Sequence, residues 1–347
     1  MAGDVGVAER VITGLRAEGA PSSEPVLHEY GPRFRIGMAT TPSAEGLDGP
    51  TVETTAFDGS EMLGWDAYKL RRSQDYAATK QARPRAGQNW GDGEPLHRET
   101  DATGHIPVPP RTSAEAPLPP TSSRLSGRVA VGLIMVSGSA PGLTLTSAEQ
   151  VKIVAEIQNG LTWLGAQSPA RDVTWVHETQ SVTVNVPEVT DGGSYEAFEA
   201  PWRDAALEKL GLGRGRPGLQ AYVQGLRTRL RTDWAYCVLF TRYPLFHFAY
   251  ADPGGPHLVM HYENDGWGPD NIDRVFAHET GHIFGAPDEY QASGCNCTSS
   301  FGFFHKPNIN CEGCAPGGGT DCIMRANTWA MCPQTPFHLG FNGLATS

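Results

Sequence analysis

The pattern of apolar and polar positions predicts a mixed α and β domain over residues 127–347. Two runs, VAVGLIMV at Val129 to Val136 and WAYCVLF at Trp234 to Phe240, are apolar throughout and typical of buried strands. Other blocks alternate or carry apolar residues at helical spacing. We expect strands at residues 128–139, 172–186, 233–243 and 257–264, and helices at residues 147–165, 195–211, 218–231 and 269–284.

Local signals predict where these helices begin and end. Ser147 and Gln150 have the spacing of a capping box, and Asp270 precedes the apolar positions of the last helix as a candidate N-cap. Pro201 lies within residues 195–211, where its ring should break or begin a helix.

Residues 1–126 show little apolar periodicity and are expected to be largely extended. Pro, Gly, Ser, Thr and charged residues dominate residues 82–127, whose second half resembles a linker. A helical piece is expected at residues 61–80. We therefore divide the chain into an N-terminal region, 1–126, that is a flexible spacer or a propeptide, and a domain at 127–347. In a propeptide, a carboxylate or histidine within residues 89–101 would cover the site described below.

Charge and hydropathy restrict the partners of the chain. Its 347 residues carry a net charge of -11 without a cluster of Lys or Arg, which argues against a nucleic-acid partner or binding to an anionic membrane. The longest apolar run is far shorter than the roughly 20 residues that span a bilayer. We expect a protein, a peptide or a small molecule as partner.

Six of the seven cysteines fall between Cys295 and Cys332. Such crowding in a Gly-rich segment predicts either disulfides, which form in an oxidising compartment, or a second metal site, and we favour disulfides. The pairing stays open. Cys237, inside an apolar strand, is expected to be a buried free thiol. The first residues show no apolar core of a signal peptide, although the cysteines favour secretion.

The segment FAHETGHIFGAPDEY, Phe276 to Tyr290, carries the chemistry of the chain. His278 and His282 are four residues apart, which on a helix means about 40° of rotation and about 6 Å of rise, so both imidazoles can reach one ion. Glu279 lies about 100° around the helix from His278, beside the ion without binding it. That position suits a general base.

A catalytic zinc site needs a third protein ligand, with water in the fourth position. Gly285 follows the apolar pattern, where a left-handed residue can cap the helix, and Pro287 prevents its continuation. Asp288 could then turn back below the two histidines and offer a carboxylate oxygen. Glu289 is a weaker candidate for the same place.

The spacing His278-Glu279-x-x-His282-x-x-Gly285-x-x-Asp288 resembles the zinc signature of the metzincin metallopeptidases, in the variant of snapalysin-type bacterial enzymes. DCIMRAN at Asp321 to Asn327 is similar to the methionine turn of that family, with Met324 beneath the metal. The resemblance implies an α+β fold: a twisted mixed sheet, an active-site helix and a Cys-rich C-terminal subdomain. It also implies an edge strand above the cleft that holds extended substrate, and residues 257–264 are similar to it in placement.

The chain departs from the family pattern in two places. Ala326 stands where some metzincins have a tyrosine that binds the metal or the oxyanion, so Tyr290 or Tyr262 would have to serve. The Cys-rich segment is also longer than the family requires. It could hold a structural Ca²⁺ through the oxygen ligands Asn308, Asn310, Glu312 or Asp321, although turn residues of these types are common on surfaces.

These expectations favour a secreted zinc endopeptidase that holds one catalytic Zn²⁺ at His278, His282 and Asp288, with Glu279 as the general base. A metallopeptidase effector toxin delivered by an injection system would explain disulfides without a signal peptide. A zinc-bound adhesion module without activity is the third hypothesis, and the intact Glu279 argues against it. Substrate specificity and oligomeric state stay open.

Overall fold

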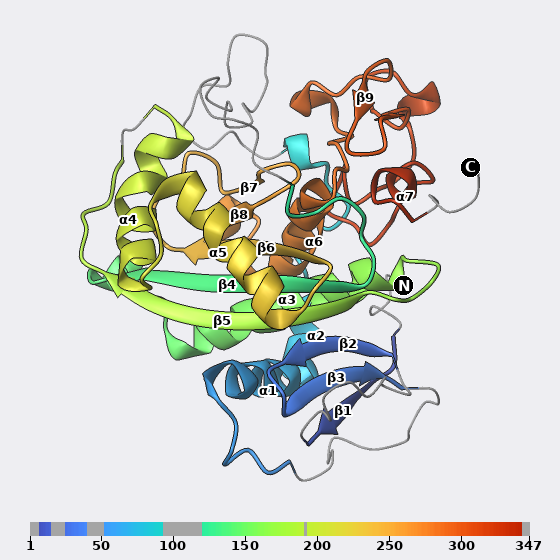
Figure 1. The fold of residues 1–347 in the computed structure, drawn as a ribbon. Helices are drawn as coiled ribbons and strands as arrows, with labels where there is room; N and C mark the ends of the chain where they lie inside the picture. The colour runs from blue at the N-terminus through green and yellow to red at the C-terminus, as the bar shows by residue number, and fades with distance from the viewer. Residues whose placement is uncertain (1–6, 15–24, 40–51, 93–119, 191–192, 342–347) are drawn as a thin grey trace.

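A computed structural model describes residues 7–14, 25–39, 52–92, 120–190 and 193–341 (Figure 1). The described helices are α1 (Gly59–Arg71), α2 (Gln74–Gln81), α3 (Ser147–Ala166), α4 (Tyr195–Lys209), α5 (Gly215–Leu230), α6 (Ile272–Ile283) and α7 (Thr335–His338). The strands are β1 (Glu9–Thr13), β2 (Val26–Tyr30), β3 (Phe34–Met38), β4 (Arg128–Gly138), β5 (Thr174–Val184), β6 (Trp234–Thr241), β7 (Ala249–Ala251), β8 (His257–His261), β9 (Ser300–Phe301) and β10 (Lys306–Pro307).

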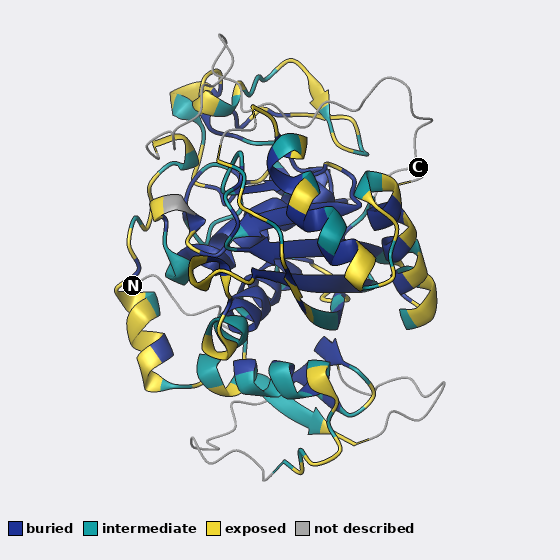
Figure 2. Ribbon diagram, turned by 90° about the vertical axis from the view of Figure 1, so that its left-hand side faces the viewer, coloured by how far each residue is buried: buried dark blue, intermediate teal, exposed yellow. Residues whose placement is uncertain are grey.

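One mixed sheet organises the molecule, in the order β1-β3-β2-β5-β4-β6-β8-β7. The central strands β2, β5, β4, β6 and β8 are parallel, and β7 joins antiparallel at one edge. The expected α+β class is confirmed. Every described residue of β4 after Arg128 is buried, because helices cover both faces of the sheet there (Figure 2).

Alternate residues of β4 point into two different cores. Val131 and Leu133 pack with α3 and α6, whereas Ala130 and Ile134 pack with α4 and α5 on the opposite face. This period of two is the reason that an apolar run without alternation becomes a central strand. The expectation of a free thiol is confirmed as well, since Cys237 of β6 is buried and unbonded.

The expectation of a largely extended N-terminal region is wrong for its described parts. β2 pairs in parallel with β5, so the sheet continues across the boundary expected at residue 126. The expected helical piece at residues 61–80 is present as α1 and α2, with Ser73 as the N-cap of α2. The short, half-polar strands β1 to β3 gain stability from pairing with distant segments, which local periodicity does not reveal. Most of the expected linker lies outside the described residues.

Two helix signals differ from expectation. The capping box of α3 is formed by Thr146 and Glu149, one residue before the expected pair. Pro201 lies inside α4 and does not end it. The proline is exposed, and Ala197, whose carbonyl loses its intrahelical partner, is only partly buried.

In the described part of the chain, no helix combines the length and apolarity needed to cross a membrane. The N-terminal strands and the C-terminal segment with β9 and α7 lie at opposite ends of the molecule (Figure 1).

Candidate metal centre

The helix α6 carries the candidate site and begins without a side-chain cap. It follows the turn Pro269–Asn271, and its N-cap residue is Asn271. Asp270 is therefore not the N-cap, contrary to expectation. Asp270 lies within the 3-10 turn, one residue before the N-cap, and its carboxylate pairs with Lys152 at 2.6 Å.

Buried charges attach α6 to the N-terminal region. Asp273, with no exposed surface, receives both guanidinium nitrogens of Arg83 at 2.5 and 2.8 Å and pairs with Lys80 at 3.1 Å. Asn159 of α3 donates to the same carboxylate at 2.7 Å. At Gly160 the helices α3 and α6 approach so closely that a Cβ would lie 2.3 Å from the carbonyl oxygen of Asp273. The start of α6 is thus fixed from two sides.

The end of α6 is a glycine cap of the expected kind. Gly285 has φ of +91° and donates to the carbonyl of His282 at 2.9 Å, while Ala286 donates to the carbonyl of Gly281 at 3.0 Å. This pair of hydrogen bonds is the Schellman motif, which requires a left-handed residue. The chain then reverses beneath the helix and delivers Asp288.

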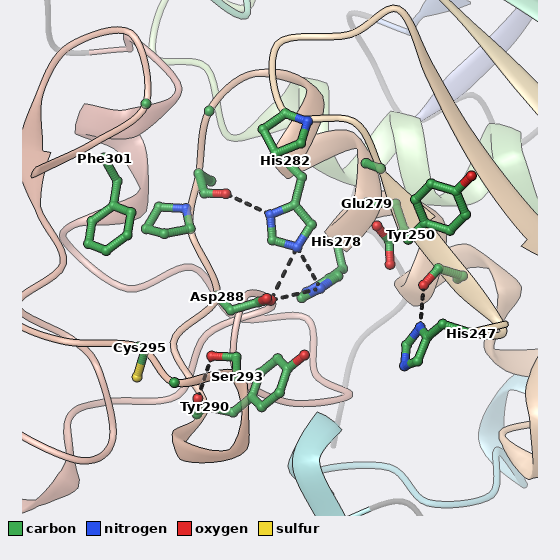
Figure 3. Close-up of a pocket in the computed structure, with 18 of the residues that line it drawn as sticks. His247, Tyr250, His278, Glu279, His282, Asp288, Tyr290, Ser293, Cys295 and Phe301 are labelled. Carbon is green, nitrogen blue, oxygen red and sulfur yellow. Dashed lines mark hydrogen bonds and ion pairs between the residues drawn. The ribbon is translucent and has the colours of Figure 1, made fainter. Parts of the chain in front are cut away.

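The structure brings His278, His282 and Asp288 together, as expected (Figure 3). The two Nε2 atoms are 3.1 Å apart, and Asp288 Oδ1 lies 3.2 Å from His278 Nε2 and 3.1 Å from His282 Nε2. We call these three residues the open cluster, because the side chains of Asp288 and His282 stay 28% and 14% exposed.

Backbone carbonyls orient both rings. His278 Nδ1 lies 3.0 Å from the carbonyl oxygen of Ile323, and His282 Nδ1 lies 2.7 Å from that of Ala286. A carbonyl only accepts, so each Nδ1 carries the hydrogen and a neutral ring presents the lone pair of Nε2. Two lone pairs and a carboxylate oxygen then face one another, an arrangement that a cation among them stabilises.

The electrostatics agree with a cation at this place. Burial lowers the pKa of His282, but the Asp288 carboxylate outweighs burial and raises the pKa to about 9. Burial raises the pKa of Asp288, and the two imidazoles reverse this effect and hold it well below the usual range. The cluster thus attracts positive charge, here a proton.

Glu279 lies beside the open cluster and faces the same pocket (Figure 3). The residue is 5% exposed, and its Oε2 has no hydrogen-bond partner among the described residues. Burial raises the pKa of Glu279 above its usual value, while the nearby histidines act in the opposite direction. A buried carboxylate with an unused oxygen can accept a proton from water.

A pocket of about 370 Å³ opens above the cluster. Tyr195 of α4, Tyr250 of β7 and Tyr290 line it, whereas Tyr262 does not belong to its lining. Of the two tyrosines expected as substitutes for the family residue, Tyr290 is therefore the one at the site. Sequence reasoning did not single out Tyr195 and Tyr250, since only tertiary folding brings them here.

The strand at this pocket is β7 and not the expected 257–264. Residues 257–261 form β8, which is paired on both sides, with β6 and with β7. Ala249 to Ala251 of β7 line the pocket and form the sheet edge among the described residues. A strand of three residues without alternation gives no signal in the sequence.

Two residues distant in the sequence pack against α6, Trp90 at His278 and Met324 at Gly281. The ring of Trp90 is tilted by 59° against that of His278, with 5.5 Å between the ring centroids, and its Nε1 donates at 2.7 Å to the carbonyl oxygen of Ile323 that His278 also contacts. Met324 is buried and packs below α6, where a Cβ at Gly281 would lie 2.8 Å from its Sδ. Trp90 was not expected at the site, and no spacing in the sequence relates it to Ile323.

The other candidate ligands lie elsewhere. The carboxylate of Glu289 points away from the open cluster, toward Cys322 and Cys332. The calcium hypothesis stays a prediction: Asn308 donates to the Asp288 carbonyl at 2.6 Å, Asn310 contacts Glu289 and Thr320, and Glu312 pairs with Arg325. Asn310 and Glu312 thus already have protein partners, whereas the Oδ1 of Asn308 is buried without one among the described residues.

The Cys-rich segment contains disulfides, as favoured. Cys295 is bonded to Cys311 and Cys297 to Cys314.

Comparisons with known proteins identify no family for this chain. No protein-family model matches the chain, and the search of curated proteins found no significant match.

Proposed function

We propose that the chain is a zinc-dependent endopeptidase of metzincin-like design. The observation that carries this proposal is the convergence of His278 Nε2, His282 Nε2 and Asp288 Oδ1 within 3.2 Å, next to the unpartnered carboxylate oxygen of Glu279. Both Nδ1 atoms are held by carbonyls, so the ring nitrogens that remain are aimed at one point.

The donor set fits zinc. Two imidazoles and one carboxylate, with a position left open toward a pocket, are the ligands of a catalytic zinc site. When bound, zinc would polarise the scissile carbonyl and lower the pKa of a water molecule to about 7.

The side chains of the site have separate tasks in this proposal. Glu279 accepts a proton from the attacking water and returns it to the leaving amine. Its burial supports the first task, because a raised pKa makes the carboxylate a better base. The hydroxyl of Tyr290, in the pocket lining, is the candidate donor to the developing oxyanion.

The substrate is a protein or peptide in extended conformation. β7 lies antiparallel at the edge of the sheet and lines the pocket, so a peptide chain can pair with its outer side, where His247 Nδ1 contacts the Ala249 carbonyl oxygen at 2.6 Å. Tyr195, Tyr250 and Phe301 give the walls an apolar character that suits a hydrophobic or aromatic side chain.

The two disulfides are consistent with an extracellular protein. Export to the medium and injection as an effector both agree with them, and we propose secretion as the simpler route.

Glu279→Gln tests this function. The change keeps the size of the side chain and removes its basicity, so we expect zinc content and thermal stability to persist while cleavage of an unfolded protein falls by a factor of roughly 10³ or more. Glu188→Gln, at an exposed loop position, is the matched control and should cleave normally. Near-normal cleavage by Glu279→Gln would refute the assignment.

A further inference from the structure

A second group of metal-ligand types lies directly behind the open cluster. Glu289, Cys322 and Cys332 place a carboxylate oxygen and two sulfurs within 4.8 Å of one another, and all three residues are at most 2% exposed. We call them the closed cluster. Glu289 follows Asp288 in the chain, but the two side chains belong to different clusters.

Backbone N–H groups donate to both sulfurs of the closed cluster. The backbone N–H of Cys332 donates to Cys322 Sγ at 3.3 Å, and those of Gln334 and Thr335 donate to Cys332 Sγ at 3.3 and 3.4 Å. Hydrogen bonds from N–H groups stabilise the charged form of a thiol. Backbone donors to sulfur are also the outer contacts that orient thiolates on a metal.

The carboxylate is oriented toward these sulfurs. Asn310 Nδ2 donates to Glu289 Oε2 at 2.6 Å and fixes that oxygen, which leaves Oε1 at 3.1 Å from Cys332 Sγ. The hydroxyl of Thr335 lies between the three groups, 3.1 to 3.3 Å from each.

No basic side chain in the part of the chain that the structure describes pairs with the closed cluster. Within the described residues no lysine or arginine forms an ion pair with Glu289, and Arg325, close in sequence to Cys322, pairs with Glu312 at 3.2 Å. A buried carboxylate beside two thiolates is costly unless a cation is bound.

We propose that the closed cluster is a second, structural zinc site. Glu289 Oε1, Cys322 Sγ and Cys332 Sγ are its protein ligands, and the Thr335 hydroxyl or a water takes the fourth position. Thiolate ligands select zinc over magnesium or calcium. Tetrahedral zinc with bonds of roughly 2.0–2.3 Å separates its ligands by roughly 3.3–3.8 Å, which a cluster of this size accommodates.

Such an ion would join three segments beneath the catalytic pocket. Glu289 belongs to the turn that delivers Asp288, Cys322 precedes Met324 by two residues, and Cys332 lies just before α7. Binding expels the two thiol protons to solvent and leaves the oxidation state of every group unchanged.

The test uses the full chain and counts zinc by mass spectrometry after dialysis. We expect two zinc ions per chain in the wild type, one in the double variant His278→Ala/His282→Ala, and one in Cys332→Ser. A single ion in the wild type that the double variant loses would overturn the closed site, and loss of both ions in the double variant would do so too. The double variant leaves every residue of the closed cluster in place, so a folding defect of Cys332→Ser does not remove the test.

Cobalt identifies the ligands and separates this proposal from the proposed peptidase. With Co²⁺ in place of Zn²⁺, the double variant should show sulfur-to-cobalt charge-transfer absorption, which requires thiolate ligands and no activity. Absence of that band, or an intact mass that reveals a third disulfide between Cys322 and Cys332, would contradict the proposal. A wild type without peptidase activity but with the band would reject only the peptidase.

Discussion

The neighbouring carboxylates of Asp288 and Glu289 belong to two different clusters, one open and one closed. Asp288 meets two imidazoles at the edge of a pocket and keeps 28% of its side chain exposed. Glu289 meets two sulfurs and is fully buried. A site that must admit water and substrate needs an open position, whereas a structural site is closed by protein ligands. The same stretch of chain thus contributes one carboxylate to an open cluster and the next to a closed one.

The N-terminal region supports the open cluster, and its removal should have the largest effect. A chain that starts at Ser126 lacks β2 and β3, the partners of α6 at Arg83 and Lys80, and the indole of Trp90. We expect it to lose a cooperative unfolding transition, as measured by calorimetry, and to lose cleavage. A folded fragment that is more active than the full chain would instead favour a propeptide.

Replacement of Asp288 or Glu289 alone should remove the metal of one cluster and leave that of the other. Asp288→Ala removes a ligand of the open cluster, so we expect its zinc and the cleavage activity to fall by orders of magnitude. Glu289→Gln should leave the zinc of the open cluster in place and remove the ion of the closed one. The measurement is zinc content after dialysis, together with cleavage. Unchanged zinc in Asp288→Ala would transfer the ligand role to another group.

The buried ion pairs of Asp273, which attach α6 to the N-terminal region, should contribute to the free energy of unfolding. Asp273→Asn leaves the buried Arg83 without its carboxylate and removes one carboxylate partner of Lys80, which keeps Glu156, so the free energy of unfolding should fall by about 3 kcal/mol at pH 7. Burial raises the pKa of Asp273, but Arg83 and Lys80 outweigh it and hold the pKa well below the usual 3.8. Its contribution is therefore complete above that ordinary value and is lost as pH falls through the lower, folded-state pKa.

Urea titrations of wild type and Asp273→Asn from pH 7 to pH 2 check this sign, and their difference should shrink toward acid. Asp66→Asn is the control, because the pair of Asp66 with Lys69 is half-exposed and should change stability by less than about 0.5 kcal/mol. A constant difference over the whole pH range would show that Asp273 does not act through its charge.

The smallest expected effect concerns the outer contact of His278. Trp90→Phe keeps an aromatic ring and removes the donor to the Ile323 carbonyl, so zinc affinity of the open cluster should weaken by about tenfold. Competition with a chelator measures this, and Trp65→Phe in α1 is the control. Equal affinities in both variants would mean that the indole only fills space.

The sequence was sufficient where interactions are local. The helical spacing of His278 and His282 and the glycine turn before Asp288 depend on residues within eleven positions, and the structure brings these side chains together. Central strands such as β4 were predicted because burial on both faces leaves an apolar run. In contrast, β7 and the contact of Trp90 arise from long-range pairing, which leaves no periodic trace.

The cysteines also show that local sequence patterns do not predict long-range contacts. Their crowding predicted disulfides but did not reveal that Cys322 and Cys332 stay apart from the two bonded pairs. Glu289, which Cys332 contacts at 3.1 Å, lies more than thirty residues earlier in the chain.

The most direct test of the central claim is cleavage of an unfolded protein by the purified chain, before and after zinc removal with a chelator and after zinc is added back. The account predicts cleavage that disappears with the zinc of the open cluster, returns with added zinc, and is missing in zinc-loaded Glu279→Gln. Cleavage that continues at full rate after the open cluster has lost its metal would contradict it.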